Sequence, residues 1–283
     1  MTQASTIAAA LLDARARGVD RLDAQLLLAH VTGQSRAWLL AHDDASLTGD
    51  QAARLRSLLA RRAAGEPFAY LVGEREFHGL ALAVGPGVLV PRPDTETLVD
   101  WALELLGQDA ADTPAVLDLG TGSGAIALAL KHRLPGARVW ASERSPDALA
   151  IARANAARLA LDVRFAHGSW WDALIDAPLF DMAVSNPPYI AENDPHLAAL
   201  THEPLSALVA ADDGLADFRA IATGARGRLR AGGWLLFEHG WTQADAVAAI
   251  LQQAGFTGVQ TRLDIEGRPR CTGGRLQAWK PWL

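Results

Sequence analysis

Three stretches near the start of the chain carry apolar side chains at helical spacing. The stripes are Ile7, Leu11 and Leu12, then Leu22, Leu26, Leu27 and His30, and then Leu55, Leu58 and Leu59. Asp20 and Gly33 are suited to begin and end the second helix. Thr48 followed by Gln51 is typical of a capping box for the third helix. The pattern predicts a small helical domain over residues 1–73.

The next stretch has the pattern of a β-hairpin. Apolar residues alternate with others from Phe77 to Val90, and glycines stand at positions 79, 85 and 87. We therefore expect a β-hairpin linker over residues 74–93, between the helical domain and a larger domain.

Strand and helix patterns alternate over the rest of the chain, residues 94–283. A helix is expected through Leu98, Trp101 and Leu105. Apolar runs that predict buried strands include residues 115–119, 138–143, 180–185 and 232–237. Such alternation predicts an α/β fold, a doubly wound and mostly parallel sheet with right-handed crossovers.

Composition narrows the class of protein. Half of the 283 residues are hydrophobic, enough for a sizeable core, yet no run approaches the roughly 18 apolar residues of a membrane span. The first residues lack the layout of a signal peptide. The single cysteine, Cys271, excludes an intrachain disulfide, and the histidines show no metal-binding spacing. The net charge of −6 argues against a nucleic-acid substrate. We therefore expect a cytoplasmic monomer that binds no metal, membrane or nucleic acid.

A glycine turn, Gly-Thr-Gly-Ser-Gly, follows the run at 115–119 and precedes a helical run. Strand, glycine turn and helix form the nucleotide-binding opening of a doubly wound sheet. Gly120, Gly122 and Ala125 also satisfy the dinucleotide spacing. S-adenosylmethionine is favoured because Asp118 stands where a carboxylate can meet that cofactor's ammonium group. Glu143, at the end of the next strand, is suited to bind ribose hydroxyls in either cofactor class.

The motif Asn186-Pro187-Pro188-Tyr189 follows the run at 180–185. Two prolines fix the backbone and offer no N–H, so the carbonyls of Pro187 and of the Asn186 side chain are expected to be free acceptors. Beside the flat face of Tyr189 they suit a planar amino group, and they favour the pyramidal nitrogen that forms during attack. Taken alone, the motif also fits a proline-stiffened turn after a strand.

Both motifs together resemble Class I methyltransferases that act on amino groups. Three further segments make the chain similar to the release-factor glutamine methyltransferases (PrmC/HemK): Val-Pro-Arg-Pro-Asp-Thr-Glu at 90–96, Glu-Pro-Leu-Ser-Ala-Leu at 203–208 and Glu-His-Gly at 238–240. The resemblance covers nearly the whole chain and implies seven strands, the last antiparallel. It also implies that S-adenosylmethionine methylates the glutamine amide in the Gly-Gly-Gln motif of peptide-chain release factors, which leaves S-adenosylhomocysteine. The helical domain would dock the substrate.

Site residues follow from the motifs and the resemblance. Asn186, Pro187 and Tyr189 are expected to be catalytic. Substrate contacts are expected from Asn186, Pro187, Pro188, Tyr189 and Arg92. Cofactor contacts are expected from Asp118, Gly120, Thr121, Gly122, Ser123, Gly124, Glu143, Trp171 and Asn186. Glu203 and Glu238 are expected to support the fold or the site, and no residue is expected to bind a metal.

One segment departs from the family pattern. Where the family has Ser-Asp-Trp, this chain has Ser169-Trp170-Trp171. Trp170 replaces the family carboxylate, and Trp171 stands on the family tryptophan. We therefore expect Trp171 to form a wall against adenine, with Trp170 behind it.

Other functions remain open at the level of sequence. An adenine-amino methyltransferase of DNA or RNA would use the same Asn-Pro-Pro-Tyr chemistry, but it should add a basic target-recognition segment that this chain lacks. A methyltransferase for a glutamine of ribosomal protein L3 would differ only in substrate docking. A scaffold that binds S-adenosylmethionine without catalysis would require a damaged acceptor site, whereas Asn186 is intact.

Overall fold

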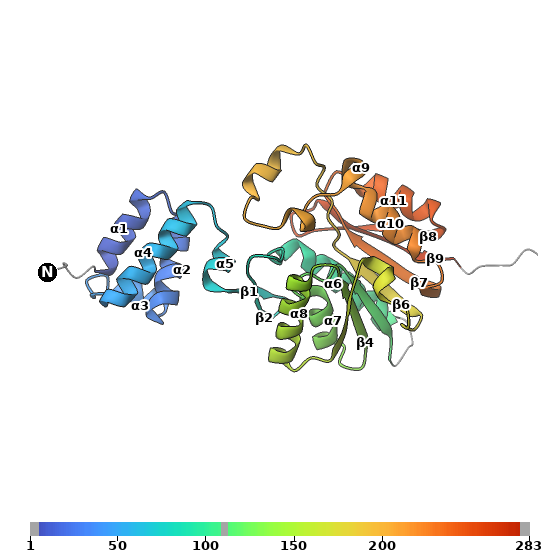
Figure 1. The fold of residues 1–283 in the computed structure, drawn as a ribbon, viewed down its shortest axis with the longest axis horizontal. Coiled ribbons are helices and arrows are strands. Elements are labelled where there is room, and N and C mark those ends of the chain that lie inside the picture. Colours follow the sequence, from blue (N-terminus) through green and yellow to red (C-terminus); the bar gives the residue numbers. More distant parts are fainter. Residues whose placement is uncertain (1–5, 109–112, 278–283) are drawn as a thin grey trace, which may run out of the picture. The chain divides into compact units, whose positions relative to one another are not determined.

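The computed structural model describes residues 6–108 and 113–277, which belong to two compact units, Met1–Glu74 and Arg75–Leu283 (Figure 1). The helices of the smaller unit are α1 Ile7–Ala16, α2 Arg21–Thr32, α3 Arg36–Ala41, α4 Gly49–Ala63 and α5 Phe68–Val72. The predicted caps are confirmed. The Asp20 carboxylate accepts from the backbone N–H of Leu22 at 2.7 Å, Gly33 ends α2 in the left-handed conformation, and Thr48 and Gln51 cap each other's backbone. 

The buried faces of α1 and α2 are rotated from the predicted stripes. Leu12 is 67% exposed and Leu22 is 47% exposed, although both belong to the predicted apolar stripes. Small residues such as Ala14 and Ala24 are buried in their place. Apolar spacing alone did not reveal this, because alanine packs helices closely without adding a large apolar signal. The unpredicted helix α3 is capped by Ser35.

The hairpin consists of β1 Glu74–Phe77 and β2 Leu80–Ala83. His78 and Gly79, the two loop residues, both have positive φ, as a tight two-residue hairpin turn requires. The side chain of Asn155, on α8 Pro146–Leu159, donates to the carbonyl of Ala83 at 3.0 Å and accepts from its N–H at 2.7 Å. These bonds make the hairpin a packed part of the larger unit.

The sheet of the larger unit has seven strands in the order β5-β4-β3-β6-β7-β9-β8. Their bounds are β3 Ala115–Leu119, β4 Arg138–Glu143, β5 Val163–His167, β6 Phe180–Ser185, β7 Leu229–Glu238, β8 Phe256–Leu263 and β9 Pro269–Leu276. Pairing is parallel from β5 to β7, and β9 runs antiparallel to both of its neighbours. The predicted doubly wound sheet with an antiparallel last strand is confirmed.

Helices cover both faces of this sheet (Figure 1). On one face, α6 Glu96–Gln108, α7 Ala125–Arg133 and α8 pack with the hairpin. On the other face lie α10 Ala216–Gly224 and α11 Ala244–Gln253, preceded by the short α9 Ala211–Gly214. β3 alternates between them, with Val116 in the first core and Leu117 in the second. Within residues 6–108 and 113–277, no helix is long and apolar enough to cross a membrane.

Candidate functional site

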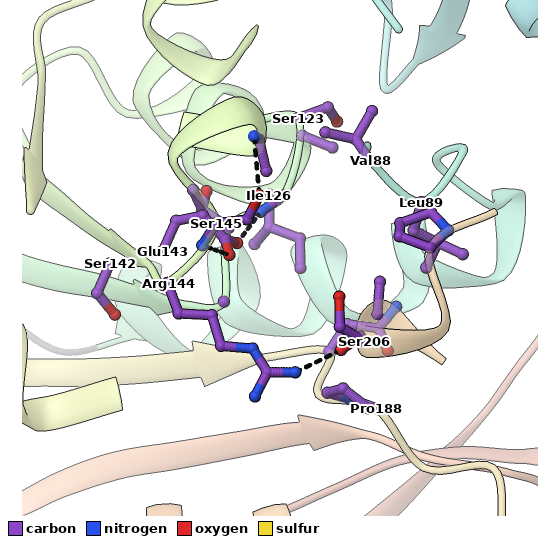
Figure 2. A pocket seen from close by; sticks show the side chains of 18 of the residues that line it. Val88, Leu89, Ser123, Ile126, Ser142, Glu143, Arg144, Ser145, Pro188 and Ser206 are labelled. Carbon is purple, nitrogen blue, oxygen red and sulfur yellow. Dashed lines mark hydrogen bonds between the residues drawn. The ribbon is translucent and has the colours of Figure 1, made fainter. Parts of the chain in front are cut away.

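A cavity lies beside the carboxyl ends of β3 and β6, which are neighbours in the sheet (Figure 2). From β3 the chain winds to one side of the sheet, and from β6 it winds to the other, so this is the topological switch point where such folds bind ligands. The Ser185 hydroxyl donates to the Leu119 carbonyl at 2.6 Å and joins the two strand ends. The cavity is open to solvent, and about 930 Å³ of space free of protein atoms lies in it and its mouth.

The glycine turn forms one wall of this cavity. Gly120, Thr121, Gly122 and Ser123 line it, whereas Gly124 instead packs against Leu128 and Ala152 at the start of α7. Gly120 has a φ of +76°, and a Cβ on it would lie 2.9 Å from the ring of Trp170. A side chain at Gly120 is therefore excluded twice, by backbone conformation and by the indole.

Glu143 ends β4 and lines the cavity. One carboxylate oxygen accepts from the N–H of Gly122 at 2.9 Å, and the other accepts from the N–H of Ser145 at 2.9 Å (Figure 2). These bonds fix the carboxylate beside the glycine turn. Each oxygen retains a further lone pair, which a ligand hydroxyl can use.

Asp118 does not line the cavity, contrary to its expected contact with a cofactor ammonium. It is fully buried inside β3, where its Oδ2 accepts from the Thr121 hydroxyl at 2.6 Å and from the Ala127 N–H at 3.1 Å. Burial raises its pKa to about 7, although the Thr121 and Ala127 hydrogen bonds oppose the shift. Within the described part of the chain, its Oδ1 has no hydrogen-bond partner. The carboxylate thus holds the glycine turn to the start of α7.

The two tryptophans have the opposite roles from those expected. Trp171 is 6% exposed, lies in the core beside Gly224, and donates its indole N–H to the Ile221 carbonyl at 2.9 Å. Trp170 is the indole that lines the cavity, against Gly120. Trp170 has a φ of +44°, in the left-handed region that residues other than glycine rarely adopt. Trp171, which was expected to form the wall against adenine, is thus buried and does not line the cavity in this structure.

Asn186 follows β6 and borders both the main cavity and a smaller adjoining one. Its side-chain Nδ2 donates to the Thr95 hydroxyl at 3.3 Å. Glu238, at the end of β7, is buried and borders the smaller cavity with Asn186, and within the described residues its Oε2 has no hydrogen-bond partner. The Asn186 amide is thus held on its nitrogen side, which leaves its carbonyl oxygen for a ligand.

The rest of the Asn-Pro-Pro-Tyr motif divides between the two cavities. Pro188 lines the main cavity, and Tyr189 lines the smaller one together with Arg92 and Glu238. Pro187 lines neither, and its carbonyl accepts no hydrogen bond from the described residues.

The backbone of Tyr189 is held in place by two residues that come later in the chain. Its carbonyl accepts from the Gln243 side chain at 3.0 Å, and Gly214 lies so close that a Cβ there would be 2.2 Å from this oxygen. Neither Gln243 nor Gly214 was identified from the sequence.

Two segments complete the cavity walls without having been assigned there. One is residues 87–91, after the hairpin, and the other is residues 204–207. Glu203 joins them, because its carboxylate accepts from the Val90 N–H at 2.9 Å and forms an ion pair with Arg92. Arg144 donates to the Ser206 carbonyl at 2.8 Å across the cavity (Figure 2). The first segment overlaps the Val-Pro-Arg motif and the second overlaps the Glu-Pro-Leu-Ser motif. These two motifs were the features of the sequence that could have placed the segments at the cavity.

The arrangement fits S-adenosylmethionine. Trp170 lines the cavity beside Gly120 and offers an aromatic surface to a ligand ring, and Glu143 offers lone pairs to vicinal hydroxyls. The glycine turn allows close approach of a ligand to the backbone. Within residues 6–108 and 113–277, no cluster of three or more acidic, histidine or cysteine side chains is suited to a metal ion.

Comparison with known sequences agrees with the motifs. A family described as PrmC N-terminal domain matches residues 3–73, and the methyltransferase small domain matches residues 95–207. The release factor glutamine methyltransferase of Bordetella pertussis is 52% identical over 92% of this chain and 96% of its own. That of Escherichia coli is 47% identical over 90% of this chain and 92% of its own.

Solved structures agree on the fold. A methyltransferase from Pyrococcus furiosus has a TM-score of 0.54 and 16% identity, over 82% of this chain and all of its own. A 16S rRNA methyltransferase of T. thermophilus, determined with AdoMet and guanosine, has a TM-score of 0.54 and 22% identity, over 72% of this chain and 50% of its own. At these identities the likeness establishes a common fold.

Proposed function

This chain belongs to the release factor glutamine methyltransferase family, and we propose that it methylates the side-chain amide of the glutamine in the Gly-Gly-Gln motif of peptide-chain release factors. The methyl donor is S-adenosylmethionine. The observation that carries the proposal is the position of Asn186, which borders both cavities and is held by its nitrogen. A donor in the main cavity and an amide in the smaller one would meet at this residue.

The main cavity would hold the cofactor. Trp170 would pack on the adenine ring and Glu143 would accept from the ribose hydroxyls, while the glycine turn admits the ligand close to the backbone. When bound, the cofactor supplies an electrophilic methyl group on a sulfonium. Arg144, which donates a hydrogen bond to the Ser206 carbonyl, would keep residues 204–207 over the ligand and so exclude water.

The smaller cavity would hold the substrate glutamine. Asn186 and Tyr189 line this cavity, so the Asn186 carbonyl would accept one N–H of the amide and Tyr189 would pack against the amide plane. Pro187 lines neither cavity, but its carbonyl, which accepts no hydrogen bond from the described residues, would accept the other N–H. Gripping both N–H bonds favours the pyramidal nitrogen required for attack over the planar one of the free amide. Arg92, paired with Glu203, would shape the entrance for the peptide. 

No general base is needed at this site. The amide proton becomes strongly acidic once the nitrogen carries the methyl group, so it can leave to water after transfer. The residues therefore act by positioning, and alignment of two bound reactants is worth up to roughly 7–11 kcal/mol. The same proposal includes a cytoplasmic, monomeric enzyme that uses no metal and binds neither nucleic acid nor membrane. The net charge of −6 supports the part of it that concerns nucleic acid.

Radiolabelled S-adenosylmethionine tests the proposal. Label should enter folded release factor and should be absent from a release factor whose Gly-Gly-Gln glutamine is changed to glutamate, since glutamate offers no N–H pair. Asn186→Ala should lower kcat by about 100- to 1,000-fold, as loss of one preorganised polar contact does, while S-adenosylhomocysteine binding by calorimetry changes little. Preferential labelling of ribosomal protein L3, DNA or RNA would overturn the substrate assignment.

A further inference from the structure

The side chain of Gln243 bridges two backbone groups at the Asn-Pro-Pro-Tyr motif. Its Oε1 accepts from the N–H of Gly240 at 2.9 Å, and its Nε2 donates to the carbonyl of Tyr189 at 3.0 Å. A backbone N–H can only donate and a backbone carbonyl can only accept, so these partners fix which end of the amide is which. Gln243 therefore joins the turn after β7 to the motif that borders the smaller cavity.

Two glycines leave the room that this bridge needs. A Cβ on Gly214 would lie 2.9 Å from the Gln243 Nε2 and 2.2 Å from the Tyr189 oxygen. A Cβ on Gly240 would lie 3.0 Å from the Gln243 Oε1. The amide fits because the backbone that it meets at both of its ends carries no side chain.

The turn that carries Gln243 is itself anchored to the sheet. The N–H of His239 donates to the carbonyl of Arg270, on β9, at 2.9 Å, and the Nε2 of the His239 ring bonds the Thr272 hydroxyl at 2.7 Å. The backbone N–H of Gln243 donates to the Gly240 carbonyl at 2.8 Å and closes the turn. Because the turn is tied to β9, a side chain that reaches out from it can hold a neighbouring segment in place.

Capping of the helix that follows does not account for this side chain. Gln243 immediately precedes α11, but its side chain makes no capping hydrogen bond to that helix. It reaches instead to Tyr189, 54 residues earlier in the chain. The side chain thus serves the Asn-Pro-Pro-Tyr segment and not its own helix.

We propose that Gln243 is a positioning residue, which holds the Tyr189 backbone so that the Asn-Pro-Pro-Tyr motif presents its acceptors and its ring to the substrate amide. The inference rests on the proposed function, because it explains how that motif keeps its shape. Asn186 is anchored by the end of β6, and Ile190 exchanges backbone hydrogen bonds with residues 208–210. The two prolines restrict the backbone in between. Gln243 holds the Tyr189 carbonyl between these two anchors.

Gln243→Glu tests the direction of the bridge. The new side chain has the same shape, and an acidic group at the start of a helix is favourable for that helix. When ionised, it still accepts from Gly240 but sets a second acceptor against the Tyr189 carbonyl, whereas its protonated form can donate to that carbonyl. Gln243→Met has a similar length and loses both hydrogen bonds at every pH. Gln253→Glu, exposed at the opposite end of α11, adds the same charge and serves as the control.

Other titratable groups near position 243 are the same in every variant. The titratable and charged groups of the segments that contact it are His239, Tyr189, Asp212 with its partner Arg219, Asp213 and Asp245. Burial lowers the pKa of His239 and raises that of Tyr189. Each kcat is divided by the wild-type value at the same pH, which removes the contribution of these groups. A pH dependence that remains belongs to the introduced carboxyl.

Each variant is assayed for kcat with folded release factor between about pH 5.5 and 8, and S-adenosylhomocysteine binding is measured by calorimetry. Gln243→Met should lower kcat by about 10- to 100-fold at every pH, because misplacement of a positioning group by about 1 Å costs up to that much. Gln243→Glu should lose as much at the alkaline end and should recover toward the wild-type value as the pH falls. Gln253→Glu should match wild type. S-adenosylhomocysteine affinity should stay within about 2-fold of wild type in every variant, as for independent sites, since Gln243 does not line the main cavity. 

The failure of this inference differs from that of the proposed function. If the unaltered protein does not methylate folded release factor, the proposed function is overturned and the inference falls with it. If the unaltered protein is active but Gln243→Met keeps the wild-type kcat, or Gln243→Glu shows the same relative kcat at every pH, the positioning role alone is overturned. A loss of S-adenosylhomocysteine affinity as large as the loss of kcat would also overturn it, since it would indicate a general effect on the fold.

Discussion

Asp118 is a buried acid that should make the stability of the larger unit depend on pH. Its carboxyl is fully buried, and burial raises its pKa from 3.8 to about 7. A raised pKa means that the folded state binds the proton more tightly than the unfolded state does. The stabilisation is complete below pH 3.8 and is lost as the pH rises through about 7.

The size of the effect follows from the shift. The interval from 3.8 to about 7, at about 1.36 kcal/mol per pH unit, corresponds to about 4 kcal/mol of folding free energy. Between pH 5 and pH 8 the wild-type carboxyl should lose about 2–3 kcal/mol of this amount. Asp118→Asn has the same shape, keeps an oxygen that can accept from Thr121 and Ala127, and does not titrate.

Urea unfolding of wild type and Asp118→Asn at pH 5 and pH 8 measures the prediction. The free energy of unfolding of Asp118→Asn relative to wild type should increase by about 2–3 kcal/mol between the two pH values. Taking the difference between proteins cancels the contribution of Glu238, whose pKa is also raised to about 7. Asp176→Asn, which removes an exposed carboxylate from the same unit, serves as the control.

A constant difference between the proteins at both pH values would refute the reasoning, because it would mean that Asp118 has the same pKa folded and unfolded. Calorimetry on Asp118→Asn separates this structural role from a direct one. An intact affinity for S-adenosylhomocysteine agrees with a residue placed behind the glycine turn, whereas a 100-fold loss, about 2.7 kcal/mol, would return Asp118 to the binding site.

Further predictions concern close packing at the two cavities. Gly120→Ala should weaken S-adenosylhomocysteine binding at least about 10-fold by calorimetry, because its Cβ would lie 2.9 Å from the Trp170 ring. Trp170→Ala should weaken that binding with little change in urea midpoint, whereas Trp171→Ala should cost about 3–5 kcal/mol of unfolding free energy; equal behaviour of the two would contradict their placement. Gly214→Ala should lower kcat, because the new Cβ would lie 2.2 Å from the Tyr189 carbonyl oxygen and would push the Tyr189 backbone out of place. Normal turnover of this variant would show that the position of the Tyr189 backbone does not matter for catalysis.

Much of the site could be placed from the sequence because the fold imposes few choices. The apolar runs before Gly120 and Asn186 predicted parallel strands, and the carboxyl ends of parallel strands lie at the same edge of a sheet. Two motifs about sixty residues apart could therefore be expected side by side, as the pairing of Leu119 with Ser185 shows.

The contacts that sequence reasoning missed depend on local geometry without a periodic signal. Nothing in the order Trp170-Trp171 reveals that the first residue has a positive φ, or that the second indole is buried while the first lines the cavity. The hydrogen bond from Asn186 to Thr95 joins two positions 91 residues apart in the chain, so it forms only once the tertiary structure brings them together. Asp118 shows the converse, since a carboxylate beside a glycine turn can face the ligand or the core, and only packing decides which.

The hydrophobic core of the helical unit is separate from the cores of the larger unit, and this has an evolutionary consequence. The helical unit has its own core, which includes Ile7, Leu27 and Leu59, whereas both cavities are lined entirely by residues of the larger unit. Substitutions on the surface of the helical unit leave the side chains around Asn186 in place. The sequence predicts that the helical unit docks the substrate; on that prediction, a lineage can alter the protein surface that this unit recognises, one mutation at a time, while selection on the methyl-transfer chemistry acts on a different set of codons.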